Sequence, residues 1–431
     1  MFEKITKDML KFIDESPTCY HVISNLEKRL DEEGYTKLLE SQSWKLKNGG
    51  KYYVTRNGSS IISFKIPKKT FKGFLMTASH SDSPSFKIKE NPEMPEGGMY
   101  VKLNVEGYGG MLDGPWFDRP LSIAGRVFVK DGDNSISMKL INIDRDLVMM
   151  PSLAIHMNRE ANSGYKFNAQ KDMQPLFGDI SSKGSFDKTI AKAAGVKSGE
   201  IIGSDLFLYN RVKPTVWGAG KEYISSSRLD DQECVYTTFE AFLNSESTSH
   251  ALVHCVFDNE EVGSTTKQGA ASTFLKDTLE RISEGCGRTR EQYHTALAQS
   301  FMLSADNAHA MHPNHADKAD PVNRPAMNKG IVIKFNAGQK YTTDGASEAM
   351  FRMVLDRAKV PYQMFTNRSD MAGGSTLGNI SNTQVALNTV DIGLAQLAMH
   401  SPYETAGAND PKYMAEGVKA FYESDIDIHI S

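Results

Sequence analysis

Apolar strand-like runs alternate with helical stretches over the second half of the chain, and this alternation restricts the possible folds most. The expected strands cover residues 252–257, 300–304 and 331–335, and the expected helices cover residues 230–243, 347–357 and 411–423. Short buried strands that alternate with helices are typical of a mostly parallel sheet covered on both faces. We therefore expect an α/β fold whose catalytic part has three layers, α/β/α.

A β-rich block interrupts this pattern. Between about Ser83 and Tyr223, glycine, proline and alternating β-type runs dominate, and only a stretch near residues 187–193 is typical of a helix. The α/β pattern returns after the block. We therefore predict a discontinuous domain of residues 1–84 and 224–431, with an inserted β-rich domain of residues 85–223.

The composition excludes several classes of protein. The 49 basic and 53 acidic residues give a formal net charge of −4, which offers no positive field for nucleic acid or a membrane surface. No apolar run approaches the roughly 20 residues that a transmembrane helix needs. The four cysteines are far apart, and acidic residues interrupt any apolar run at the N-terminus. These features predict a reduced, cytoplasmic protein.

Residues able to bind a metal follow three of the apolar runs, and two more stand near expected helices or loops. In chain order the candidates are His80, Asp82, Asp230, Glu260, Glu261, Asp306 and His400. Ligands of open α/β sheets bind at the carboxyl ends of the strands. One crevice at that edge could therefore collect these side chains.

Two histidines and three carboxylates are too many ligands for one catalytic zinc, which takes about three protein ligands and keeps one position open. They fit two ions if one carboxylate bridges them, and a metal pair can hold a hydroxide and a carbonyl oxygen together. Asp82, two residues from His80, is suited to fix the tautomer of that imidazole. Glu260 is suited to be the general base.

Each residue taken alone has a simpler structural interpretation. His80 could be a hydrogen-bonded residue at a strand end, and Asp230 could be a helix N-cap. The pair Glu260-Glu261 could be a solvated face or a helix N-terminus, where the helix dipole favours acids. Asp306 could be a turn residue. Only the combined pattern favours a catalytic site.

That combined pattern resembles a known family over nearly the whole chain, the M18 metallopeptidases or aspartyl aminopeptidase family. The resemblance rests on TASHSDSPSFKIK (77–89), NVEGYGGMLDGPWFDRPLSIAGR (104–126), LAIHMNRE (153–160), SSSRLDDQ (225–232), FDNEEVGS (257–264), SADNAHAMHPN (304–314), KGIVIKFNAGQKY (329–341) and MHSPYETAG (399–407). No single segment is specific, but the ordered series is.

The resemblance implies a set of metal ligands. His80, Asp230 and Asp306 would hold one zinc ion. Glu261, His400 and the same bridging Asp230 would hold the other, so that each subunit carries two zinc ions.

The resemblance also implies further roles. Asp82 and Glu260 would be the catalytic pair, and His156 of a neighbouring subunit would stabilise the developing oxyanion. Lys334 would line the pocket for the first side chain of the substrate. His309, three residues beyond a proposed ligand, is expected near the substrate.

The function that follows is a zinc metallo-aminopeptidase that removes single N-terminal residues from peptides. Some members of the family prefer Asp or Glu at that position, and others accept neutral or apolar residues. In the family the inserted domain forms dimers, which assemble into hollow homo-oligomers, usually dodecamers. Two alternatives stay open. One is a metal-dependent amidase or deacylase that acts on non-peptide amides. The other is a non-enzymatic assembly protein with a vestigial site.

Overall fold

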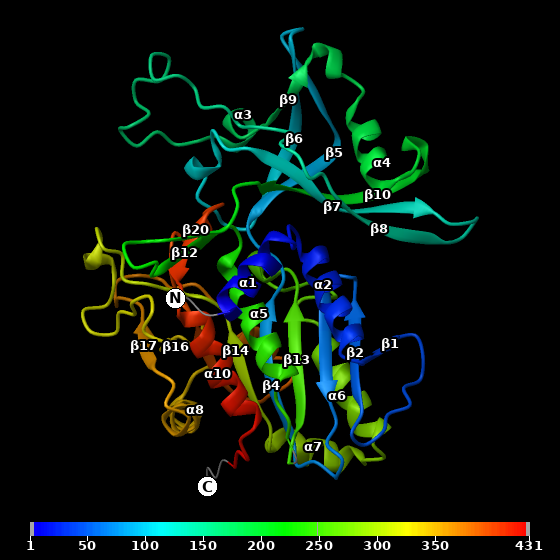
Figure 1. The fold of residues 1–431 in the computed structure, drawn as a ribbon, viewed down its shortest axis with the longest axis vertical. Helices are drawn as coiled ribbons and strands as arrows, with labels where there is room; N and C mark the ends of the chain where they lie inside the picture. The colour runs from blue at the N-terminus through cyan, green and yellow to red at the C-terminus, as the bar shows by residue number, and fades with distance from the viewer. Residues whose placement is uncertain (1–3, 248, 428–431) are drawn as a thin grey trace.

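A computed structural model describes residues 4–247 and 249–427 of the chain. Its larger part is built on a nine-stranded mixed sheet (Figure 1). In spatial order the strands are β1 (Thr36–Leu38), β2 (Lys51–Arg56), β3 (Ser60–Lys65), β13 (Ala251–Phe257), β4 (Phe74–His80), β14 (Phe301–Ala305), β18 (Asn388–Gly393), β16 (Ile331–Phe335) and β17 (Tyr362–Thr366). Strands β13, β4, β14 and β18 are parallel, whereas β3 and β16 flank them in antiparallel pairs.

Apolar side chains fill both faces of the central strands, as expected for parallel strands covered on two sides. All seven residues of β4 are buried, and Leu75 belongs to one apolar cluster while Phe74 and Met76 belong to the other. Successive side chains of a strand point to opposite faces, so the two clusters lie on the two sides of the sheet.

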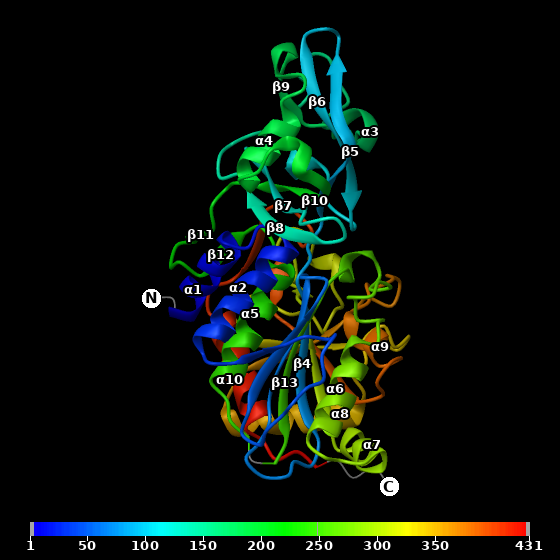
Figure 2. The same ribbon diagram turned by 90° about the vertical axis from the view of Figure 1, so that its right-hand side faces the viewer.

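Helices cover both of these faces (Figure 2). One cluster includes α2 (Cys19–Glu32), α5 (Leu229–Leu243), α8 (Gly345–Ala358) and α10 (Asp410–Tyr422), with α1 (Lys4–Asp14) packed on α5. The other includes α6 (Phe274–Gly285), α7 (Arg290–Ala298) and α9 (Leu377–Ser381). The predicted three-layer α/β/α fold is confirmed. Within residues 4–247 and 249–427, no helix is long and apolar enough to cross a membrane.

A second sheet of six antiparallel strands forms a separate body above the first in Figure 1. Its order is β8 (Ile136–Asn142), β7 (Leu121–Lys130), β10 (Ile201–Asn210), β5 (Ser85–Glu96), β6 (Tyr100–Tyr108) and β9 (Leu176–Asp179). Helix α4 (Phe186–Ala194) closes the core of this sheet, and the short α3 (Ala169–Asp172) precedes β9. The chain leaves the large sheet at the end of β4 and enters this body at Ser85.

A third, five-stranded sheet combines short strands from distant parts of the chain, and its strands β12 and β20 lie between the two larger bodies in Figure 1. Its strands are β11 (Thr215–Trp217), β12 (Tyr223–Ser226), β20 (Glu404–Gly407), β19 (Ala395–Leu397) and β15 (Ala308–His309). Strand β11 falls inside the predicted insertion, yet it pairs with β12. The domain limits 85 and 223 therefore stay a prediction, while the β-rich sheet itself spans residues 85–210.

Candidate metal centre

The residues that the sequence singled out as ligands converge beyond the carboxyl ends of the central parallel strands. His80 is the last residue of β4, and Asp306 directly follows β14. Glu261 lies in a 3-10 turn, Glu260–Val262, shortly after β13. Asp230 comes from the start of α5, and His400 comes from the loop between β19 and β20.

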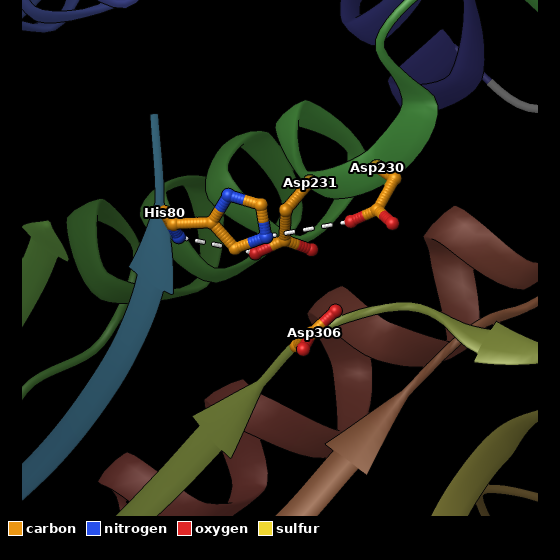
Figure 3. A group of neighbouring side chains, drawn as sticks. All are labelled: His80, Asp230, Asp231 and Asp306. Atoms are coloured by element: carbon orange, nitrogen blue, oxygen red, sulfur yellow. Dashed lines mark hydrogen bonds and ion pairs between the residues drawn. The ribbon is translucent and has the colours of Figure 1, made fainter. Parts of the chain in front are cut away.

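The first group of potential ligands consists of His80, Asp230, Asp231 and Asp306 (Figure 3). Each offers one ligand atom, and these atoms all lie within 4.8 Å of one another. His80 Nε2 is 3.4 Å from Asp230 Oδ1. All four residues are buried, so an ion held there would be shielded from water on the protein side.

The second group consists of Asp230, Glu261 and His400, again with ligand atoms within 4.8 Å of one another. His400 Nε2 lies 3.4 Å from Asp230 Oδ2 and 3.4 Å from Glu261 Oε2. Glu261 is nearly buried, whereas the His400 side chain is 33% exposed. Asp230 therefore belongs to both groups, with one carboxylate oxygen toward each histidine.

Asp230 has a special local conformation. With φ −79° and ψ 109° its backbone is not helical, although it lies within the range of α5. Its side chain faces His80 and His400 instead of capping helix N–H groups. Burial raises the pKa of this carboxyl, but its bonds with His400 and His80 outweigh burial and lower the pKa below the usual value. An ionised carboxylate is the form that a metal needs.

Asp82 joins the strand end to the Glu260-Glu261 turn. Its carboxylate accepts the backbone N–H groups of Glu260 and Glu261, each at 3.2 Å. His80 Nδ1 lies 3.0 Å from the backbone oxygen of Asp82 and 3.4 Å from its Oδ1. These acceptors favour a proton on Nδ1, so Nε2 is the nitrogen that would be available to a metal ion.

Glu260 is half-buried, and its carboxylate forms a third group of possible ligand atoms with His80 and Glu261, all within 4.8 Å of one another. Burial raises its pKa from 4.5 to about 8, partly opposed by His80 and reinforced by the charges of Asp306 and Asp82. A carboxyl group tuned toward neutral pH suits a general acid or base. The structure thus places Glu260 where the sequence predicted a proton carrier, and its role stays a prediction.

Two carboxylates that were not predicted from the sequence, Asp231 and Glu404, accept hydrogen bonds from the backbone of the ligand residues. Asp231 Oδ2 accepts the backbone N–H of His80 at 3.1 Å. Glu404 accepts the backbone N–H of His400 at 2.8 Å and that of Asp230 at 3.0 Å. Asp231 adjoins a predicted ligand, but no sequence pattern indicates the hydrogen bonds of Asp231 or Glu404, because both depend on how distant segments meet.

Three other predicted residues lie outside the ligand groups. Lys334 on β16 is buried, and its Nζ donates to the backbone oxygens of Asp306 (2.7 Å) and Asn307 (3.3 Å). His309 ends β15 and is exposed, with its ring centroid 6.2 Å from that of Phe365. His156 lies exposed in the loop between β8 and α3 and belongs to none of the ligand groups found among the described residues.

The chemistry of the donor set fits divalent metal ions. Among the described residues, the buried oxygens Asp231 Oδ1 and Glu261 Oε1 have no hydrogen-bond partner. Buried carboxylate oxygens without partners are costly unless a cation offsets their charge. Imidazole nitrogens and carboxylates are also ligands that zinc accepts. The fold and the site therefore define a metal-dependent enzyme with its centre at the carboxyl edge of an α/β sheet.

Comparison with known proteins agrees with this class. The sequence model described as "Aminopeptidase I zinc metalloprotease (M18)" matches residues 12–422. A "Probable M18 family aminopeptidase 2" of Clostridium acetobutylicum is 46% identical over 427 residues, covering 97% of this chain and 98% of that protein. A protein of the same name from Pseudomonas aeruginosa strain PAO1 is 37% identical over 433 residues, covering 98% of this chain and 99% of that protein.

Solved structures show the same similarity. The Ape4 chain in "Cryo-EM structure of the Ape4 and Nbr1 complex" superimposes with a TM-score of 0.94 at 35% identity, covering 97% of this chain and 85% of that chain. A chain of the S. cerevisiae mApe1 dodecamer superimposes with a TM-score of 0.85 at 29% identity, covering 97% and 96%.

The chain belongs to the M18 family of metallopeptidases. It is a zinc metallo-aminopeptidase, as the sequence predicted. The non-enzymatic alternative is thereby set aside.

Proposed function

We propose that this aminopeptidase uses two zinc ions per subunit to remove single residues from the N-termini of peptides. The observation that carries the proposal is the shared position of Asp230, whose two carboxylate oxygens face His80 and His400 at 3.4 Å each. One carboxylate that serves two ligand groups is the arrangement expected of a bridging ligand.

The residues that would hold the ions follow from the two groups. His80, Asp230 and Asp306 would hold one ion, and Asp230, Glu261 and His400 would hold the other. Asp231, within the first group, already accepts the backbone N–H of His80. When bound, zinc lowers the pKa of water and polarises a carbonyl oxygen.

Proton transfer in this proposal belongs to Glu260. Its carboxylate takes the proton of the attacking water and later delivers it to the amine that leaves when the peptide bond breaks. Asp82 holds Glu260 in place through the backbone N–H of that residue. Asp82 also sets the tautomer of His80, so it acts through its neighbours.

Catalysis in this proposal also needs a second subunit. His156 lies in a loop whose large side chains Leu153, Ile155 and Met157 are exposed, and exposed apolar patches mark association surfaces. We propose that residues 85–223 form the dimerisation domain and that His156 donates to the oxyanion formed in a neighbouring subunit. The mApe1 relative is a dodecamer, which supports proposing the same assembly here.

The acidic preference depends on Lys334 and stays a prediction. Burial lowers the pKa of the Lys334 ammonium, but the charge of Asp306 raises it, and the pKa lies above its usual value overall. The Lys334 side chain is therefore a cation. Its Nζ, however, donates to Asp306 and Asn307 and lies 3.8 Å from Asp306 Oδ2. These contacts support a role in positioning Asp306, and His309 is the more accessible residue for substrate contact.

A profile of cleavage with measured metal content tests the proposal. The protein loaded with zinc should release the first residue of dipeptides and aminoacyl reporters, and it should contain two ions per chain by elemental analysis. Full activity with one ion would overturn the two-zinc proposal. Cleavage of N-acyl substrates, with aminoacyl substrates left intact, would favour the deacylase alternative instead.

A further inference from the structure

The segment Tyr108–Leu112 crosses from the six-stranded sheet to the metal centre, and we call it the strap. It begins at the last residue of β6. The Tyr108 hydroxyl donates to Asp82 Oδ2 at 2.7 Å and accepts from Asn259 Nδ2 at 2.8 Å. Asp82 is the carboxylate that also accepts the N–H of Glu261. The strap therefore supports the Glu260-Glu261 turn through one shared acceptor.

Gly109 contacts this turn directly. A Cβ atom added at Gly109 would lie 3.1 Å from Glu261 Cβ and 3.4 Å from the Glu261 backbone oxygen. Its φ of +76° is also in the region that favours glycine. Glycine thus permits both the backbone conformation and the close approach, so the strap lies against Glu261 with no space between them.

The far end of the strap reaches the other ligand of the same group. The backbone N–H of Leu112 donates to the backbone oxygen of His400 at 3.1 Å. His400 has a φ of 65°, which few residues other than glycine adopt. A bond to its carbonyl oxygen helps to hold this backbone in place. The strap therefore touches Glu261 and His400, the two residues that form the second group together with Asp230.

We propose that the strap is a positioning element that sets the affinity of the second ion, the one assigned to Asp230, Glu261 and His400. A Cβ atom added at Gly109 would lie nearest to Glu261, and the backbone N–H of Leu112 donates to His400, so both of these contacts are made with the second group. Groups that orient metal ligands commonly change metal affinity by 10–100-fold. The inference rests on the two-zinc function proposed above.

Zinc titration of the metal-free full chain, followed by calorimetry, tests this inference. Two variants probe the strap. Gly109→Ala presses on Glu261, and Tyr108→Phe removes only the hydroxyl that Asp82 accepts. In Gly109→Ala we expect one of the two zinc affinities to fall by about 10-fold or more and the other to change by less than about threefold. Tyr108→Phe should cause a smaller loss that falls mainly on the same ion, with a slight loss at the other because Asp82 also contacts His80.

Two reference variants show which ion is affected. His400→Ala should lose the second ion, and Asp306→Asn should lose the first. The cobalt absorption spectrum of Gly109→Ala, taken during titration, should resemble that of His400→Ala at low occupancy. Resemblance to Asp306→Asn would overturn the assignment of the strap to the second ion.

Matched controls separate this effect from general damage. Gly98 has a similar positive φ (+67°) in the turn between β5 and β6, but no atom lies within 4 Å of the Cβ that Gly98→Ala would add. Tyr209→Phe removes a hydroxyl that donates to Asn142 at 2.7 Å, away from the ligands. Both controls should keep two zinc sites of unchanged affinity.

The outcomes distinguish the two proposals. If the unaltered chain binds one zinc ion, the two-zinc function fails. If it binds two and Gly109→Ala and Tyr108→Phe also bind two with unchanged affinity, the strap proposal alone fails. Equal weakening of both ions, or equal effects in Gly98→Ala, would show a merely structural role. Should Gly109→Ala not fold, Tyr108→Phe decides, because its ring can keep its packing on Phe207.

Discussion

Asp230 Oδ2 lies 3.4 Å from His400 Nε2, while the other oxygen of the same carboxylate lies 3.4 Å from His80 Nε2. The two histidines come from opposite ends of the chain, and this one side chain joins them. Glu404 fixes the arrangement further, because it accepts the backbone N–H groups of both Asp230 and His400. The two ligand groups therefore share one charged side chain, Asp230, and one supporting carboxylate, Glu404.

Asp230→Ala should lose both zinc ions and all measurable activity. Removing the bridge takes one ligand from each ion and leaves two positive charges unshielded at short range. Asp306→Asn is the matched comparison, since Asp306 belongs to only one group and its loss should cost one ion. Elemental analysis after dialysis measures the zinc content of the two variants. Two ions retained by Asp230→Ala would falsify the bridging role.

Glu260→Gln should slow turnover by roughly 10²–10⁴-fold, the usual contribution of a positioned general base. The amide keeps the size of the side chain but cannot take the proton of water. Zinc content should hardly change, because each ion would keep the three ligands proposed for it, although Glu260 also lies close to His80 and Glu261. If the variant loses zinc and each remaining ion is as active as before, Glu260 is a ligand and not the base.

The strands that carry the site could be predicted because they are apolar on both faces. Residues 331–335 were predicted as a strand and form β16, and the predicted strand 252–257 extends by one residue in β13. His80, Asp306 and Glu261 follow such strands, so their convergence at one sheet edge could be expected from the order of strands and helices.

Other features depend on tertiary contacts that leave no periodic signal. The strands β15, β19 and β20 have only two to four residues each, and they pair across distant parts of the chain. The antiparallel pairing of β16 with β18 is a further contact of this kind, within a sheet that is mostly parallel as expected. The support of His400 by Glu404 and of Glu261 by the strap likewise requires the folded chain.

Lys334→Met should reduce activity on all substrates by similar factors, about tenfold or more. The variant fills the same space but leaves the backbone oxygens of Asp306 and Asn307 without their buried donor. Asp306 is then held less firmly, so affinity for the first ion should also fall. A panel of Asp, Glu, Leu and Met substrates makes the comparison. A loss confined to Asp and Glu substrates would show instead that Lys334 reads the first side chain.

Removal of zinc should make stability fall as the pH rises from about 5 to about 8. In the metal-free site, burial and acidic neighbours raise the pKa values of Glu260 and Glu404 from 4.5 to about 8. The folded chain then binds more protons than the unfolded chain over this range, so the free energy of unfolding decreases with pH. The raised pKa of His80 acts in the same direction.

Denaturant unfolding of the metal-free chain at several pH values measures this slope. Glu404→Gln should make the slope shallower, because one of the groups with a raised pKa is gone. Zinc-loaded protein should show little or no decline, since the ions offset the ionised carboxylates. Stability of the metal-free chain that rises between pH 5 and 8 would contradict the expectation.

Activity should depend on association, because His156 is exposed and belongs to none of the ligand groups found among the described residues of its own chain. His156→Ala and Glu260→Gln subunits should each be nearly inactive alone. Mixing them should restore part of the activity, because a site with intact Glu260 can then receive an intact His156 from its neighbour. Exchange of subunits must be shown first, for example by energy transfer between labelled chains. Subunits that carry both substitutions are the control. Mixed with either single variant, they should not raise its activity. No recovery after proven exchange, or a fully active monomer by sedimentation, would exclude a site shared between subunits.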